Sequence, residues 1–187
     1  MLTGKLIRFR EFRSDDIPAV TAMRNDVTVR AGTTRSMIIP ISEGSIQRDF
    51  EAAYNPVSFP YILETLEGEF IGFCKFNNSF KDRRTTVSLE IKPEEQGKGY
   101  GSDALTLILN LVFMEMNMNK CATLLLANNA VAIHLLKKAG FTVEVVLRED
   151  VYRHGVYQDA VFLGLLKEEY LAGLNLNSQN RSSGSLT

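Results

Sequence analysis

The centre of the chain constrains the fold most, because a strand, a glycine-rich loop, a helix and a second strand follow one another there. Thr85–Ile91 reads as a strand, and Lys92–Tyr100 is polar and rich in glycine. Ser102–Met116 is apolar on most faces, as in a helix buried against a sheet. Cys121–Ala127 is a short apolar run, typical of a central strand covered on both sides. Strands joined through a helix in this way run parallel, so the sequence predicts a parallel crossover within the sheet.

The residues before this region predict one strand, two helices and the start of an antiparallel meander. A serine followed by two acids and a proline marks the start of the first helix, and Asn55-Pro56 ends the second. Glu67-Gly68 is a hairpin signal between two strand-like runs. The expected elements are a strand at Leu6–Phe9, helices from Ser14 to Asn25 and at Glu43–Tyr54, and strands at Ser58–Thr65 and Phe70–Phe76, with residues 26–40 irregular.

The residues after the central region predict one more helix and a closing pair of strands. Asn129–Ala139 reads as a helix that stops at Gly140, followed by strands at Phe141–Val151 and Val156–Leu166. From Leu174 onward the chain is rich in Asn, Ser and Gly, which predicts a disordered tail at 174–187 after a single domain at 1–173. The fold class is therefore α/β, with a mixed, mostly antiparallel sheet and about four flanking helices.

Charge and composition exclude several classes of protein. Lys and Arg number 21 against 22 Asp and Glu, so no global basic field exists to hold DNA. The longest apolar stretch, 104–114, is too short to cross a membrane, so we expect a cytoplasmic protein. Cys74 and Cys121 lie in apolar strand-like runs and are expected to be buried, reduced thiols. Two isolated histidines do not make a zinc site, and no metal is expected.

The loop Gln96-Gly97-Lys98-Gly99-Tyr100-Gly101 is the sharpest chemical signal in the sequence. Three glycines in five positions let the backbone turn several N–H groups in one direction. The helix that follows adds the partial positive charge of its N-terminus. Together these features predict a binding site for a diphosphate.

Two common nucleotide-binding motifs do not fit this loop. A P-loop needs a Ser or Thr after Gly-Lys, but Gly99 follows Lys98. A dinucleotide site needs Gly-x-Gly-x-x-Gly and an acid about 20 residues later. Here the glycines are spaced Gly-x-Gly-x-Gly, and the next strand ends in Asn128-Asn129. The diphosphate therefore belongs to a different kind of ligand.

The loop resembles the signature of the GCN5-related N-acetyltransferases (GNAT), Gln/Arg-x-x-Gly-x-Gly/Ala, at Gln96, Gly99 and Gly101. Asn129, and the Gly140-Phe141 pair that ends its helix, are similar to a second family motif at the right separation. The resemblance covers about residues 5–170 and implies a GNAT-like sheet. The closing segments Leu147-Arg148-Glu149, Tyr152-Arg153 and Tyr157-Gln158-Asp159 resemble the branch that contains ribosomal-protein N-terminal acetyltransferases.

The resemblance implies acetyl-CoA as a co-substrate. Its diphosphate would lie on the loop amides, and its pantetheine arm would pair with Leu89–Lys92 where the sheet splays. Asn129 would contact the cofactor arm, act as a helix N-cap, or do both. The implied cofactor-binding residues are Ile91, Gln96, Gly97, Lys98, Gly99, Tyr100, Gly101, Ser102 and Asn129.

Transfer of an acetyl group to an amine requires a base, because amines are protonated at neutral pH. We expect Glu90 to serve, since alternation along the strand separates it from Leu89 and Ile91 and directs it toward the groove. The competing interpretation is a structural ion pair between Glu90 and an arginine. Weaker candidates for the base are Glu64, Asp150 and His154. A backbone N–H near Ile91 is the expected donor to the oxyanion.

The general acid departs from the family pattern. Many members have a tyrosine seven residues after the asparagine that starts the helix, but Leu136 stands there in this chain. Tyr152 is our candidate replacement, with Tyr157 or solvent as the alternatives. The leucine also motivates a second hypothesis, a non-catalytic acyl-CoA-binding sensor or regulatory module.

The expected reaction is direct transfer to a primary amine, because no cysteine lies in the loop to form an acyl-enzyme. The acceptor is a small-molecule amine or a protein N-terminus, and the sequence does not decide between them. A polyamine acceptor would require acids in the groove, for which Glu43, Glu51 and Glu64 are available. A ribosome contact or a homodimer is compatible with the sequence, but no motif demands either.

Overall fold

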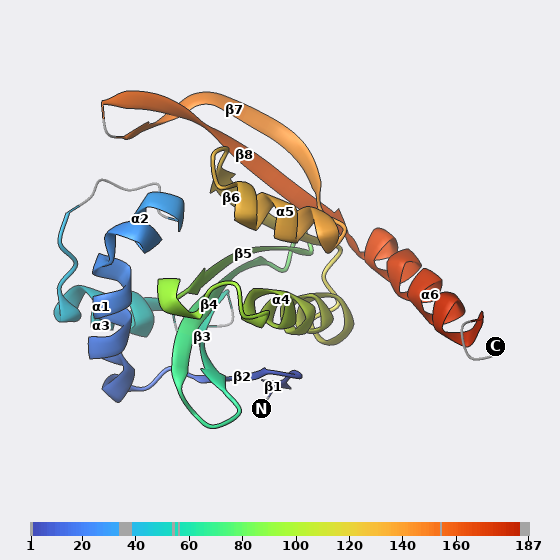
Figure 1. Ribbon diagram of the computed structural model, residues 1–187, viewed down its shortest axis with the longest axis horizontal. Coiled ribbons are helices and arrows are strands. Elements are labelled where there is room, and N and C mark those ends of the chain that lie inside the picture. Colours follow the sequence, from blue (N-terminus) through green and yellow to red (C-terminus); the bar gives the residue numbers. More distant parts are fainter. Residues whose placement is uncertain (1, 34–38, 54, 56, 154, 184–187) are drawn as a thin grey trace.

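A single sheet of eight strands forms the centre of the computed structural model (Figure 1), which describes residues 2–183 except 34–38, 54, 56 and 154. The strand order is β1-β2-β3-β4-β5-β6-β8-β7. The strands are β1 Leu2–Thr3, β2 Ile7–Glu11, β3 Ser58–Thr65, β4 Phe70–Ser79, β5 Arg84–Ile91, β6 Lys120–Leu126, β7 Thr142–Arg153 and β8 Val156–Leu166. The helices are α1 Ile17–Asn25, α2 Val27–Thr33, α3 Glu43–Ala53, α4 Tyr100–Asn110, α5 Ala130–Lys138 and α6 Lys167–Ser183. The mixed α/β class is confirmed.

The parallel crossover at the sheet centre is also confirmed. All the paired strands are antiparallel except β5 and β6, which α4 joins. These two strands are in register only at Arg84–Thr86 against Lys120–Ala122, which is the beginning of each strand. Beyond these pairs they diverge and leave a V-shaped gap. The main-chain groups of Val87–Ile91 and Thr123–Leu126 that face the gap are therefore not paired across it.

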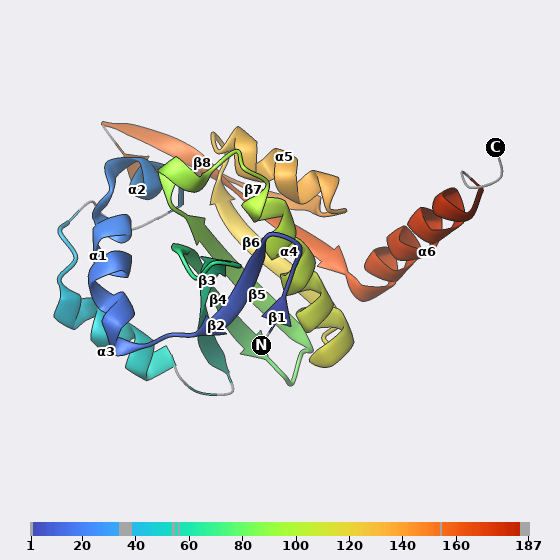
Figure 2. The same cartoon turned by 60° about the horizontal axis from the view of Figure 1, so that its bottom comes forward.

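Helices cover both faces of the sheet (Figures 1 and 2). The larger core packs α4 and α5 against one face, around Phe76, Ile108 and Leu163, all three fully buried. The smaller core packs α1 and α3 against the other face, around Ile46, Ile62 and Phe73. The diverging ends of β5 and β6 therefore lie between two differently packed layers of helices.

Three sequence predictions need correction, and one strand was not predicted. Residues 26–40 are not wholly irregular, because α2 occupies Val27–Thr33 after Asp26 caps it through hydrogen bonds from Thr28 and Val29. The chain after Leu174 was expected to be disordered, yet α6 continues to Ser183, since an established helix gains one hydrogen bond for each added residue. With α2 and α6, the helices exceed the expected four. An unpredicted strand, β1, also pairs with β2.

The remaining elements agree with the predictions to within a few residues. The segment expected at Ser102–Met116 divides into α4 and a π-helical turn at Leu111–Glu115. Both cysteines are buried free thiols, as expected. Of the helices that the structure describes, none has the length and apolar character needed to cross a membrane. Likewise, the described His, Cys, Asp and Glu side chains form no group of three or more placed for a metal ion.

Candidate functional site

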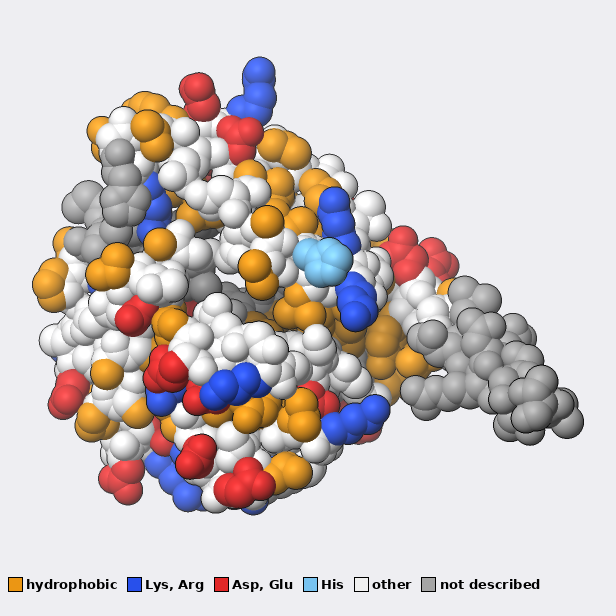
Figure 3. Space-filling model, viewed as in Figure 1, with side chains coloured by type: hydrophobic (Ala, Val, Ile, Leu, Met, Phe, Trp, Pro, Cys, Tyr) orange, Lys and Arg blue, Asp and Glu red, His pale blue; other side chains and the backbone are white. Residues whose placement is uncertain are grey.

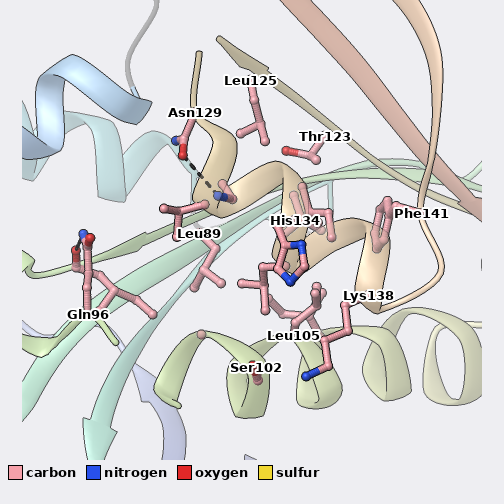
Figure 4. A pocket seen from close by; sticks show the side chains of 18 of the residues that line it. Leu89, Gln96, Ser102, Leu105, Thr123, Leu125, Asn129, His134, Lys138 and Phe141 are labelled. Carbon is pink, nitrogen blue, oxygen red and sulfur yellow. Dashed lines mark hydrogen bonds between the residues drawn. The ribbon is translucent and has the colours of Figure 1, made fainter. Parts of the chain in front are cut away.

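A largely apolar pocket of about 450 Å³ lies between α4, α5 and the diverging strands β5 and β6. The space-filling view shows hydrophobic side chains gathered around a hollow in the middle of this face (Figure 3). The close-up shows Gln96 at one end of the pocket and Phe141 at the other, with α4 as the floor and α5 as the roof (Figure 4). The pocket therefore runs from the glycine-rich loop along the gap between the two strands.

The loop geometry supplies donors at the polar end of the pocket. Gly97 and Gly99 have φ angles of 76° and 92°, a region that side-chain-bearing residues rarely adopt. Ser102 and Asp103 donate the first hydrogen bonds of α4 to the carbonyl oxygen of Gly99. The amides of Tyr100 and Gly101 precede these bonds, at the positive end of the helix. An anion at this end of the pocket would meet both the amides and the helix dipole.

Gln96 braces the end of β5. Its Nε2 donates to the carbonyl oxygen of Ile91 at 3.0 Å, which ties the loop to the strand. On the other edge, the N–H of Lys92 donates to the carbonyl oxygen of Ile71 in β4. Successive N–H groups of a strand point to opposite edges. The N–H of Ile91 therefore points toward the gap, where a ligand can reach it.

The structure brings most of the predicted cofactor-binding residues together. The predicted residues that line the pocket are Ile91, Gln96, Gly97, Gly99, Gly101, Ser102 and Asn129. Lys98 and Tyr100 are not among the lining residues. The Lys98 ammonium instead pairs with Glu95 at 2.9 Å and lies half exposed on the loop surface. A contribution of Lys98 to binding would therefore be a surface charge rather than a wall of the pocket.

Asn129 is the N-cap of α5, which was one of its two predicted roles. Its Oδ1 accepts a hydrogen bond from the N–H of Ala132 at 3.1 Å, which closes the first turn of α5 (Figure 4). Its Nδ2 donates to the carbonyl oxygen of Gly32 in α2 at 2.8 Å. Both polar atoms of the amide therefore already have partners within the protein.

Glu90 lies on the face of the sheet opposite the pocket-lining residues Leu89 and Ile91. The expected alternation is correct, but the pocket is on the side of the apolar residues, and Glu90 faces the layer of α1 and α3. It is 8% exposed, and its carboxylate lies 3.9 Å from the Arg24 guanidinium. Burial raises the pKa of Glu90 above its usual range, although the positive charge of Arg24 opposes this. None of the described residues of α1 and α3 lines the pocket.

Glu64, a weaker candidate for the base, belongs to a structural network instead. Its two carboxylate oxygens accept hydrogen bonds from Arg8 at 2.5 Å and from Arg10 at 2.6 Å. Arg10 also makes a forked contact with Asp16, which joins β2 to the start of α1. Burial tends to raise the pKa of Glu64, but the hydrogen bonds from Arg10 and Arg8 together hold it below its usual range. A carboxylate engaged in this way is a poor proton acceptor.

Among the described residues, neither the candidate acid Tyr152 nor the candidate base Asp150 lines the pocket. Tyr152 is 62% exposed and packs on Tyr157 near the end of the β7–β8 hairpin, with ring centroids 5.0 Å apart. Leu136 lines the pocket at the position where the family pattern has tyrosine. Asp150 is exposed on β7. His154 lies outside the described residues.

Sequence reasoning missed three polar residues of the pocket, namely Thr123 on β6 and two on α5. His134 and Lys138 both line it from α5, and Lys138 extends toward Ser102 on α4 (Figure 4). Residues four apart share one face of a helix, so the spacing of these two was a readable signal. Lys138 adds a positive charge to the wall across from the glycine-rich loop.

Comparison with known proteins is consistent with this geometry. Residues 7–142 match the family described as "Acetyltransferase (GNAT) domain". This chain belongs to the GNAT acetyltransferase family. The structure is also similar to a spermidine N-acetyltransferase from Vibrio cholerae, solved in complex with CoA and spermine, with a TM-score of 0.82. That likeness covers 88% of this chain and 98% of the other at 21% identity, and it shows a shared GNAT fold.

Two curated relatives bear on the branch of the family. Spermidine N(1)-acetyltransferase of Escherichia coli is 33% identical over 90 residues, which cover 48% of each protein. The chain thus matches about half the length of that relative. The putative ribosomal N-acetyltransferase YdaF of Bacillus subtilis is 26% identical over 105 residues, 56% of this chain and 57% of that protein.

Proposed function

We propose that this GNAT protein transfers an acetyl group from acetyl-CoA to a primary amine. The observation that carries the proposal is the V-shaped gap between β5 and β6, which opens directly from the glycine-rich loop. An elongated ligand with an anionic end and a strand-like arm fits such a site. Family membership makes acetyl-CoA that ligand.

The residues present suit acetyl-CoA. The loop amides of Gly97–Gly101 would hold the diphosphate at the N-terminus of α4. The unpaired edge of Val87–Ile91 would hydrogen-bond the amide groups of the pantetheine arm, as an added strand would. Apolar side chains such as Leu89, Leu125 and Leu135 would cover its alkyl segments. When bound, acetyl-CoA supplies the activated acetyl thioester.

The remaining chemistry falls to residues around the gap. The N–H of Ile91 points into the gap and would stabilise negative charge on an acyl oxygen there. Glu90, on the far face of the same strand, would take the proton of the incoming amine directly or through water. A carboxylate with a raised pKa is better matched to this task than an ordinary surface glutamate. In this arrangement the acceptor approaches from the layer of α1 and α3.

The relatives suggest a polyamine as the first acceptor to test, and the protein N-terminus as the second. The E. coli and V. cholerae relatives are named for spermidine, and YdaF for the ribosome. None of the three acids noted for a polyamine groove lines the pocket, however. Glu43 and Glu51 are exposed on α3, and Glu64 is paired with two arginines. Glu90, with Asp49 beyond Arg24, provides the negative charge on the acceptor side.

A second candidate function rests on Leu136. A leucine in the pocket cannot protonate the departing thiolate, which favours an acyl-CoA-binding sensor that does not turn over. The two functions differ in one observable. An acetyltransferase releases free CoA thiol when an amine acceptor is added, whereas a sensor binds acetyl-CoA and releases no free thiol.

The test is thiol release from acetyl-CoA with a panel of amines. Spermidine, spermine, a peptide with a free α-amine and its N-acetylated form make up the panel. We expect saturable thiol release with at least one free amine and none above background with the blocked peptide. Tight acetyl-CoA binding without release for any amine would favour the sensor instead.

A further inference from the structure

The short helix α2 is held at its C-terminal end by side chains from two distant parts of the chain. Asn129, at the start of α5, donates to the carbonyl oxygen of Gly32 at 2.8 Å. Arg153, at the end of β7, donates to the carbonyl oxygen of Arg30 at 2.6 Å. Both acceptors belong to the last turn of α2.

Both donors are placed for this role. Arg153 is 5% exposed, and its positive charge lies at the negative end of the helix dipole. Asn129 reaches α2 with the one polar atom that the cap of α5 does not use. A helix of seven residues is marginal on its own, so its position depends on such external contacts.

The place of α2 gives these bonds a functional meaning. The helix contacts both β5 and β6, the two strands that diverge. It lies between α1 and the β7–β8 hairpin in both ribbon views (Figures 1 and 2). It thus stands beside the gap between β5 and β6, which the amine of the proposed function would reach from the face that carries Glu90. Any acceptor that reaches the gap from that face meets α2.

We propose that Asn129 and Arg153 are positioning residues that fix α2 as a wall of the acceptor site, and so set the affinity for the amine rather than for acetyl-CoA. The inference rests on the proposed function, because it assigns the acceptor side of that same site. It differs from the role that the family resemblance implies for Asn129, which is contact with the cofactor arm. In this structure the polar atoms of Asn129 reach α5 and α2.

Asn129→Ser separates the two bonds of the asparagine. A serine keeps an oxygen for the cap of α5 but is too short to reach Gly32. Loss of one hydrogen bond that orders the wall is expected to raise KM for the amine about fivefold. The Kd of acetyl-CoA, measured by calorimetry, should change less than twofold. Asn128→Ser is the matched control, because the Asn128 side chain donates to Gln158 rather than to α2, and it should leave both constants unchanged.

Arg153 gives an independent test at the same helix end. Arg153→Met removes the donor but keeps an apolar stem, and it should raise KM for the amine in the same way. Arg153→Lys restores a cationic donor and should recover part of the loss. The double variant with Asn129→Ser should cost less than the product of the single effects, because both residues hold one helix.

A readout independent of activity is hydrogen exchange at the amides of α2. Both single variants should speed exchange in Val29–Thr33 relative to wild type and to Asn128→Ser, without bound ligand. If Asn129→Ser instead weakens acetyl-CoA and leaves KM for the amine and α2 exchange unchanged, Asn129 is a cofactor contact and the inference is wrong. A wild-type protein that transfers no acetyl group would defeat the proposed function instead, and the exchange result would still report on the helix.

Discussion

Replacing Glu90 with glutamine tests the proposed base and has opposite consequences for activity and for stability. Glutamine has the same shape but accepts no proton at neutral pH. The loss of a positioned general base lowers a rate by about 100-fold to 10,000-fold. We expect a fall in kcat of that size, with the Kd of acetyl-CoA unchanged, because Glu90 does not line the pocket.

The stability effect follows from the surroundings of the carboxylate. Arg24 lies 3.9 Å away, where opposite charges attract by about 4 kcal/mol at an effective dielectric of about 20. The pKa of Glu90 is raised nevertheless, so the cost of burying the charge exceeds this attraction. At neutral pH the neutral glutamine should therefore make the protein at least as stable as wild type.

The raised pKa of Glu90 also determines how its contribution to stability changes with pH. The native state binds the Glu90 proton more tightly than the unfolded state does, so its contribution to stability falls as pH rises from the unfolded to the folded pKa. The stability difference between wild type and Glu90→Gln should thus be largest at neutral pH and vanish in acid. Wild-type activity should fall as pH drops through the raised pKa of Glu90, and the variant should lack this dependence.

Steady-state thiol release and urea unfolding between pH 4 and pH 8 measure both effects. Glu51→Gln is the matched control, because Glu51 is exposed and contacts only Gln47 among the hydrogen bonds that the structure describes for it. An unchanged kcat in Glu90→Gln would refute the role of Glu90 as the base. A marked loss of stability at neutral pH would show that the ion pair with Arg24 is structural.

Three further predictions concern the network, the loop and the thiols. Glu64→Ala leaves two arginines without their carboxylate and should lower the unfolding free energy by about 2–4 kcal/mol, less than for a fully buried pair because the Arg8 side chain is 33% exposed. Since the pKa of Glu64 is lowered, this loss of stability is present at neutral pH and disappears in acid. Urea titration of both proteins at several pH values would expose an error in either statement. Gly99→Ala places a side chain at a φ angle of 92° and against Leu6, at a cost of about 1–2 kcal/mol. Restoring the loop geometry on binding would then weaken acetyl-CoA binding roughly tenfold, as measured by calorimetry. Equal binding would contradict the loop geometry. Burial raises the pKa of Cys121 to about 12, so a thiol reagent at pH 8 should label Cys74 and Cys121 only after unfolding, and rapid labelling of the native protein would show that this region opens.

The fold was largely predictable because its central signals are local. The strand at Ser58–Thr65 was placed to the residue, and the crossover from β5 to β6 followed from element order alone. The exceptions depend on tertiary contacts. The composition of α2 gives little helical signal, and the bonds from Asn129 and Arg153 that hold it come from residues about 100 positions away. The tail after Leu174 lacks an apolar stripe, yet it extends a helix that began at Lys167.

The site was predictable where the backbone defines it and less so where side chains from several elements meet. The glycine spacing identified the loop, and Ile91 and Asn129 were placed in the same pocket. Alternation along β5 was correct, but a period of two cannot tell which face carries the pocket, and Glu90 proved to face α1 and α3. The exposure of Tyr152 reflects how far the β7–β8 hairpin extends, which its sequence does not specify.

The decisive experiment is isothermal titration calorimetry with acetyl-CoA, with ATP, a triphosphate, and NAD⁺, a diphosphate, as controls. We expect one site that binds acetyl-CoA far more tightly than either nucleotide, and a gain in unfolding free energy of about 2.7 kcal/mol at 100 times the Kd. Absence of acetyl-CoA binding, or equal binding of ATP, would contradict the assignment of the gap between β5 and β6 as the site for acetyl-CoA.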